Sequence, residues 1–252
     1  MSRENFGKTS FLKHTKNSKI LLPHLPLVGP IEFVEPYNEN CFGNVMTESD
    51  EGRKTLNQVW QRILETMRKR LLTVPLSAEE LTAAATSFSL GLDEKSNPAN
   101  EELLLQRFVA YLRLLLDEEV YNTYVPADVS EVAKNSDGRL FGKPVWDFSY
   151  PESSFFITED KFIGCSITST RPGDVIYVAR GSTYPLVLRP EGEEYQIRGF
   201  AYVHGLMHAE RQEWYKDLGG PAQSLPYSLR YPKTAILFQI GSARRDLDVN
   251  SV

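Results

Sequence analysis

The sequence predicts an α+β protein in which a helical bundle is followed by a small antiparallel β-sheet or barrel. Three observations carry this prediction. Apolar residues recur with the helical period of about 3.6 between residues 50 and 120. After residue 150 they alternate with the period of two that is typical of strands. Residues 126–150, between the two regions, are rich in turn formers and weakly apolar. Helices and strands are therefore expected in separate stretches of the chain.

The first expected helix has one apolar face and one charged face. Its apolar residues are Leu56, Trp60, Ile63, Leu64, Met67 and Leu71. A second helix is expected to begin at the capping box of Ser77 and Glu80 and to end near Gly91.

A third helix is expected to start at Asn97-Pro98, a cap followed by a proline in the first helical position. Residues 103–116 are apolar around most of the helix, which predicts the most buried helix of the set. The acids in residues 117–121 then fall at its C-terminal end, where the helix dipole disfavours them, so we expect a solvated charge run.

The strand region reads as two hairpins and two further strands. Residues 155–166 predict a hairpin with Glu159 and Asp160 at its turn. A turn at residues 171–174 leads into a second hairpin over residues 175–188, because glycine and proline bracket its two apolar runs. Further strands are expected at residues 195–204 and 234–241.

These patterns divide the chain into four parts. They are an irregular N-terminal arm (1–50), a helical bundle (51–125), a linker (126–150) and a small antiparallel β-barrel with one short helix (151–245). The order, helices before strands, is what separates this sequence from an alternating α/β protein.

Composition limits the class of protein. The net charge is −5, and a diffuse acidic balance argues against a nucleic-acid binder that depends on phosphate contacts. Two distant cysteines, Cys41 and Cys165, form no disulfide framework, and Cys165 is expected to be a small buried side chain. No apolar run approaches the ~20 residues of a membrane helix. We therefore expect a cytoplasmic protein without a membrane contact.

His204 and His208 are four residues apart, the spacing of two ligands on one helix face. Strand alternation in the preceding residues, with Tyr195, Ile197, Gly199, Ala201 and Val203 on one face, instead places His204 at a strand end. Gly205 then breaks the strand, and Glu210 lies on a different side of any helix from His208. A strand-to-helix corner with packed histidines is favoured, and a metal site built on His204 and His208 is the alternative.

Cations recur along the strand region with aromatic residues between them. The cations are Lys161, Arg171, Arg180, Arg189 and Arg198, and the aromatic residues are Phe162, Tyr177, Tyr184, Tyr195, Phe200 and Tyr202. On a small barrel such a set is typical of a surface that stacks bases and contacts phosphates. Asp174, Glu191, Glu193 and Glu194 dilute it, so nucleic-acid binding is kept only as an alternative.

An ordered set of residues in the strand region resembles the C-terminal region of fungal heterokaryon incompatibility (HET) proteins. The set is Phe156, Thr158, Gly164, Pro172, Gly173, Asp174, Gly181, Pro185, Leu188, Arg189, Tyr195, Gly199, Tyr202, Val203, His204, Gly205, Met207 and Glu210. The chain departs from the family pattern at residues 164–167, where Gly-Cys-Ser-Ile replaces Gly-x-Gly-Pro, at Phe200 in place of a glutamate, and at Ala209 in place of a glycine.

The resemblance implies a non-enzymatic regulatory or recognition module of fungal nonself recognition that acts through protein contacts. HET proteins carry an N-terminal α/β effector domain, which this sequence is expected to lack, so the partner would be an effector domain or another incompatibility protein. No catalytic residue, cofactor or metal is expected. A possible interaction surface is the barrel corner with Asp174, Arg189, Tyr202 and His204. The alternatives are a nucleic-acid-binding barrel and a metal-dependent hydrolase using His204 and His208.

Overall fold

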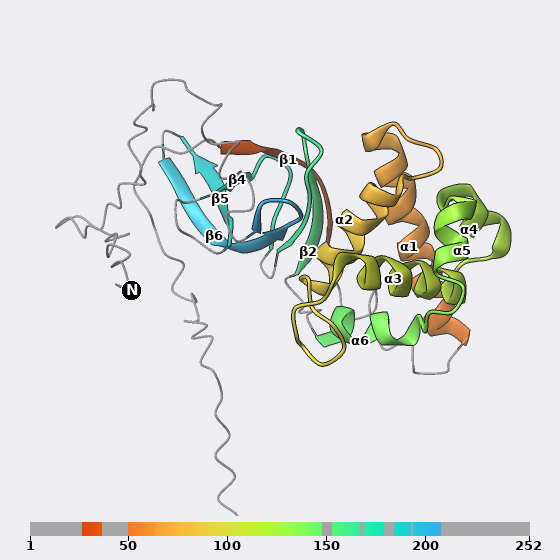
Figure 1. The fold of residues 1–252 in the computed structure, drawn as a ribbon. Coiled ribbons are helices and arrows are strands. Elements are labelled where there is room, and N and C mark those ends of the chain that lie inside the picture. Colours follow the sequence, from red (N-terminus) through yellow and green to blue (C-terminus); the bar gives the residue numbers. More distant parts are fainter. Residues whose placement is uncertain are drawn as a thin grey trace, which may run out of the picture.

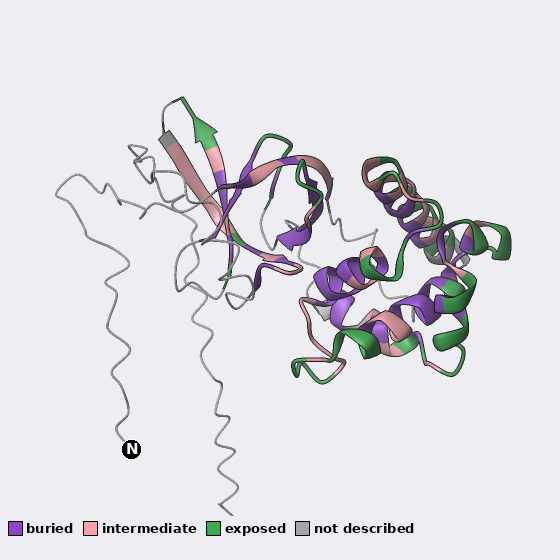
Figure 2. Cartoon of the chain, turned by 45° about the horizontal axis from the view of Figure 1, so that its top comes forward, coloured by how far each residue is buried: buried purple, intermediate pink, exposed green. Residues whose placement is uncertain are grey.

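A computed structural model describes residues 27–36, 50–147, 153–166, 169–178, 184–192 and 194–207. They form a helical unit beside a β-barrel (Figure 1). The helices turn their buried faces toward one another, and exposed residues collect on their outer sides and turns (Figure 2). The predicted α+β class is confirmed.

The described strands close into an antiparallel barrel. They are β1 (Leu27–Pro36), β2 (Ser154–Thr158), β3 (Ile163–Ser166), β4 (Val175–Tyr177), β5 (Leu186–Glu191) and β6 (Glu194–Val203). Their order is β1-β2-β3-β6-β5-β4, and β4 pairs back onto β1. The predicted β2–β3 and β4–β5 hairpins are confirmed. The strand predicted at 234–241 lies outside the described residues.

Strand β1 corrects the prediction that residues 1–50 are an irregular arm. It pairs with β2 along residues 31–36 and with β4 along residues 27–30. Register shifts lie on both sides of Pro30, and the Pro30 carbonyl accepts a hydrogen bond from the Glu159 N–H (2.9 Å). Proline has no N–H to donate, and a sheet tolerates it at such irregularities. Pro30 therefore lies at an irregular point of the strand, where the pairing with β2 and β4 is offset.

The helical unit is an insertion between two neighbouring strands. β1 ends at Pro36, β2 begins at Ser154, and these two residues are paired. Every described helix lies between them in the sequence. The chain therefore leaves the barrel and returns to it at adjacent points, which ties the helical unit to one place on the barrel wall (Figure 1).

The described helices are α1 (Asp50–Leu71), α2 (Ala78–Ser89), α3 (Glu101–Leu115), α4 (Glu118–Tyr124), α5 (Ala127–Val132) and α6 (Arg139–Asp147). The predicted apolar face of α1 is buried, with Leu71 half-buried at its end. The predicted capping box of α2 is present in both directions, between Ser77 and the N–H of Glu80 and between Glu80 and the N–H of Ser77. Helix α2 ends at Ser89, and the two residues that follow it, Leu90 and Gly91, have positive φ.

Three expectations for the helical region were wrong. Helix α3 begins after Asn100, which accepts from the Glu102 N–H (2.7 Å), rather than at Asn97-Pro98, because Pro98 pairs with Leu92 in an isolated bridge. The acids of residues 117–121 are exposed, as the predicted solvated charge run requires, but they open α4 instead of ending α3, and the positive end of the α4 dipole favours them. Residues 126–150 are not a linker, since α5 and α6 occupy much of them; these helices are too short for periodicity to reveal.

Two hydrophobic cores share the wall formed by β2 and β3. Phe155 and Ile163 face the helical unit and belong to its core, whereas Phe156 faces the barrel interior together with Ile176 and Val203. This division follows from strand alternation. Buried side chains on both sides of one wall hold the helical unit and the barrel together.

A bulge interrupts the alternation predicted for β6. The register of β5 against β6 shifts between Val187 and Leu188. Ala201 and Val203 point into the barrel core, whereas Tyr195 and Ile197 pack in a separate cluster with Tyr177 and Leu188. The prediction of one uninterrupted face from Tyr195 to Val203 was therefore wrong, because a bulge moves the side chains beyond it to the other face.

Candidate functional site

Asp174 and Arg189 form an ion pair in which the acid is fully buried and the arginine is partly buried. Arg189 donates from Nε to Asp174 Oδ1 (2.7 Å) and from Nη2 to Oδ2 (2.8 Å), and the Arg171 N–H donates to Oδ2 (3.0 Å). The Asp174 side chain is 0% exposed. Hydrogen bonding to the Asp174 carboxylate raises the pKa of Arg189 above its ordinary value. By strand alternation Asp174 shares the face of Ile176, so the pair lies at the end of the barrel interior.

Hydroxyl-bearing residues also lie near the Asp174–Arg189 ion pair. Ser154 Oγ and Thr170 Oγ1 are 2.5 Å apart and buried. Arg189 Nη2 also reaches the carbonyl oxygen of Ser169, next to Thr170, at 3.5 Å. The barrel end is therefore closed by polar groups that satisfy one another, and Asp174 presents no surface to a partner.

Tyr202 and His204 lie at the seam between the helical unit and the barrel. Tyr202 packs over Gly91, where an added Cβ would come within 2.9 Å of Tyr202 Oη. His204 Nδ1 lies 2.9 Å from Thr86 Oγ1 and 3.7 Å from Glu101 Oε1. The structure thus divides the four predicted residues into two pairs, one closing the barrel and one at the seam, instead of gathering them at one corner.

A groove of about 370 Å³ runs along the seam between α2 and the β2–β3 hairpin. Apolar residues Ala83, Phe162 and Ile163 line it together with Glu79, Asp160, Lys161 and His204. Glu79 and Asp160 are exposed, and Ile163 is buried. The groove therefore combines an apolar base with charged groups that solvent and a partner can reach.

The predicted corner at the histidines is confirmed as far as it is described. Strand β6 ends at Val203, His204 follows it, and Gly205 turns the chain with a φ of 74°. His208 and Glu210 lie outside the described residues. Within the described segments, no group of three or more His, Cys, Asp or Glu side chains is placed to hold a metal ion.

The cations of the strand region have polar partners. Each of the four described ones lies against a carboxylate or an amide: Lys161 against Glu32, Arg171 and Arg189 against Asp174, and Arg198 against Gln196. Arg180 lies outside the described residues. Of the aromatic residues, Tyr184 and Phe200 pack edge to face on the exposed side of the barrel, with ring centroids 6.4 Å apart. The four described cations therefore do not form a continuous positive surface without acidic or amide partners, and nucleic-acid binding stays a hypothesis.

Sequence reasoning missed the polar residues by which α2 holds the barrel. Thr86 contacts His204, and Ser87 Oγ donates to the Ile163 carbonyl (3.1 Å). Both hydroxyl residues are buried. The sequence does contain a signal for these contacts. The C-terminal half of α2 is made mostly of small side chains with hydroxyl groups among them, a composition typical of a helix that packs closely against another backbone.

The described residues define the class of protein: a closed barrel of six strands with a helical insertion between β1 and β2. Residues 150–216 match the Het-6 beta-barrel domain, a domain of fungal HET-type proteins. The match suggests a heterokaryon-incompatibility-type family, in agreement with the resemblance noted in the sequence. It covers β2 to β6 and excludes β1 and the helices. No curated protein and no solved structure matches the chain. In the described residues no helix has the length and apolarity to span a membrane.

Proposed function

We propose that this chain is a non-enzymatic regulatory or recognition module of fungal nonself recognition, acting in the cytoplasm through contacts with a protein partner. The observation that carries the proposal is the match of residues 150–216 to the Het-6 beta-barrel domain, on a segment that folds as five strands of a closed barrel. The partner is an effector domain or another incompatibility protein.

The way the barrel uses its polar residues supports this role. Asp174 and Arg189 are committed to each other, and His204 is engaged by Thr86. Groups that satisfy internal contacts stabilise a rigid scaffold. A rigid scaffold that presents a surface suits recognition.

We assign the contact surface to the seam groove. Its accessible acids, Glu79 on α2 and Asp160 on the β2–β3 turn, belong to the two different units. A partner that fills the groove would therefore contact the helical insertion and the barrel together. The apolar base of the groove would bury apolar surface of the partner, and the charged residues at its rim would fix the orientation in which the partner binds.

The test is genetic, in the fungus that encodes the chain. Deletion of the gene is expected to change the outcome of hyphal fusion, from cell death to a viable heterokaryon or the reverse, against at least one strain in a panel of isolates. Glu79→Lys should reproduce the deletion. Unchanged outcomes in every pairing would contradict the proposal.

Glu119→Lys is the matched control. Glu119 is the second residue of α4, as Glu79 is the second residue of α2; both are exposed, and Glu119 does not line the groove. Both substitutions replace an exposed acid in the first turn of a helix by a cation, and only Glu79 lines the groove. If Glu119→Lys changed the outcome of hyphal fusion as Glu79→Lys does, the groove would not be the contact surface.

A further inference from the structure

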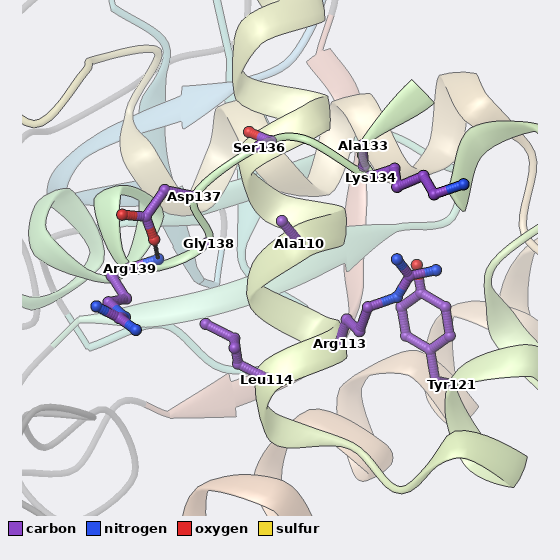
Figure 3. Close-up of a pocket in the computed structure, with 10 residues that line it drawn as sticks. All are labelled: Ala110, Arg113, Leu114, Tyr121, Ala133, Lys134, Ser136, Asp137, Gly138 and Arg139. Carbon is purple, nitrogen blue, oxygen red and sulfur yellow. Dashed lines mark hydrogen bonds between the residues drawn. The ribbon is translucent and has the colours of Figure 1, made fainter. Parts of the chain in front are cut away.

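A second cavity lies on the helical unit, among α3, α4 and the α5–α6 turn. Its volume is about 150 Å³. Small-molecule sites usually measure roughly 300–1,000 Å³, so this cavity suits a single side chain rather than a cofactor. Figure 3 shows Ala110 and Leu114 on the α3 face of the cavity, with Arg139 to one side of them and Arg113 and Lys134 to the other.

The charge of the cavity opposes that of the chain. Three cations and one carboxylate, Asp137, line it, whereas the whole chain has a net charge of −5. Asp137 is already engaged, since its Oδ1 accepts from the Arg139 N–H (3.0 Å) at the start of α6. The lining is therefore a local positive site on an acidic protein, and such a contrast steers acidic partners.

Arg113 is held in place without being neutralised. Its Nη2 donates to Ser130 Oγ (2.5 Å), and its guanidinium carbon lies 5.1 Å from the centre of the Tyr121 ring. Tyr121 Oη also donates to Ser130 Oγ (3.0 Å), which fixes the hydroxyl that Arg113 contacts. A hydroxyl and an aromatic face position the guanidinium but leave its charge uncompensated.

Other described arginines contrast with Arg113. Carboxylates pair with Arg62, Arg68, Arg70, Arg107 and Arg189. In the described part of the chain, neither Arg113 nor Arg139 has a carboxylate within ion-pair distance of its side chain. Lys134 pairs with Glu131 (3.0 Å), but both side chains are more than half exposed, and such a pair contributes little. Arg113 is thus preorganised for a carboxylate that the described chain does not supply.

We propose that this cavity docks an acidic segment of a partner protein, with one glutamate or aspartate side chain bound by Arg113 and a second one bound by Arg139. An apolar side chain of the same segment rests on Leu114, which is 52% exposed beside the cations. This apolar contact favours a peptide over a free inorganic anion. The proposal involves the helical unit alone and does not depend on the family role of the barrel.

The test measures peptide binding to the full chain at low salt by fluorescence anisotropy. The probe is the labelled, end-blocked peptide Glu-Glu-Leu-Glu-Glu, and its uncharged counterpart is Gln-Gln-Leu-Gln-Gln. We expect the glutamate peptide to bind at least about tenfold more tightly, because it alone supplies charge-assisted hydrogen bonds. Equal binding of the two peptides would overturn the proposal, as would full displacement by an equal concentration of inorganic phosphate.

Arg113→Gln and Arg139→Gln should each weaken binding about tenfold, the equivalent of about 1.4 kcal/mol. Lys95→Gln is the matched control, because Lys95 is exposed and does not line the cavity. Arg139 is exposed, and no hydrogen bond or ion pair of its side chain is described, so its replacement should not impair folding. Wild-type affinity in both arginine variants, or an equal loss in Lys95→Gln, would reject the site.

Discussion

Phe88 of α2 stacks on Phe155 of β2, with ring centroids 4.7 Å apart and ring planes inclined by 5°. Both side chains are buried, and they join the helical unit to the outer face of the barrel wall. Because the helical unit is inserted between β1 and β2, this contact and the chain connections act at the same place. The two units are therefore expected to unfold together.

Phe155→Ala should lower the free energy of unfolding by about 3–5 kcal/mol, the usual cost of removing a buried aromatic ring. Urea unfolding followed by circular dichroism measures it. Phe200→Ala is the control, since Phe200 is a barrel phenylalanine that is 51% exposed, and its loss should cost under about 1 kcal/mol. Hydrogen exchange should show α2 and β6 opening in one step, and separate opening would contradict the coupling of the two units.

Arg189→Met should cost about 3–5 kcal/mol of unfolding free energy, because it leaves the buried Asp174 carboxylate without its partner. Arg171→Met is the matched control. Arg171 Nε lies 3.9 Å from the same carboxylate, but its side chain is 62% exposed, so the loss should be under about 1 kcal/mol. Combining Arg189→Met with Asp174→Asn should cost less than the sum of the two single changes, and strict additivity would argue against the pair.

Gly91→Ala tests the seam at Tyr202. The alanine would carry a Cβ 2.9 Å from Tyr202 Oη at a φ of 72°. Gly192→Ala is the control: its φ is 64° and nothing lies within 4 Å, so it should show only the left-handed backbone cost of about 1–2 kcal/mol. Gly91→Ala should lose more in thermal or urea unfolding. Adding Tyr202→Phe to Gly91→Ala removes the atom nearest to the new Cβ, and should recover part of the stability lost in Gly91→Ala. If no stability were recovered, the alanine would not be clashing with the Tyr202 hydroxyl.

Acid should weaken the contact between α1 and α4. Hydrogen bonds from Arg68 and from Tyr124 lower the pKa of Glu65 from 4.5 to about 2. Because the folded pKa lies below the unfolded one, the stabilisation is present above about pH 4.5 and is lost as pH falls toward 2. Glu65→Gln should flatten the stability profile in this window, and Tyr124→Phe should raise the Glu65 pKa measured by NMR titration. A profile identical in Glu65→Gln and wild type would exclude this residue as the cause.

Local patterns in the sequence predicted the elements that depend on neighbours along the chain. The apolar stripe of α1 and the Ser77–Glu80 capping box needed only helical spacing. The β2–β3 and β4–β5 hairpins needed only short apolar runs around a turn. Each of these signals is complete within a few residues, which is why the sequence alone contained it.

The tertiary structure decided what distant residues do to one another. The sequence around Pro30 did not predict a strand, and only pairing with β2 and β4 made one. Asp174 and Arg189 were predicted as surface, and closure of the barrel buried the acid and joined the two. Tyr202 and His204 were predicted beside them, and packing of α2 placed them at the seam instead. Barrel closure and helix docking depend on contacts between residues far apart in the chain, which local periodicity does not encode.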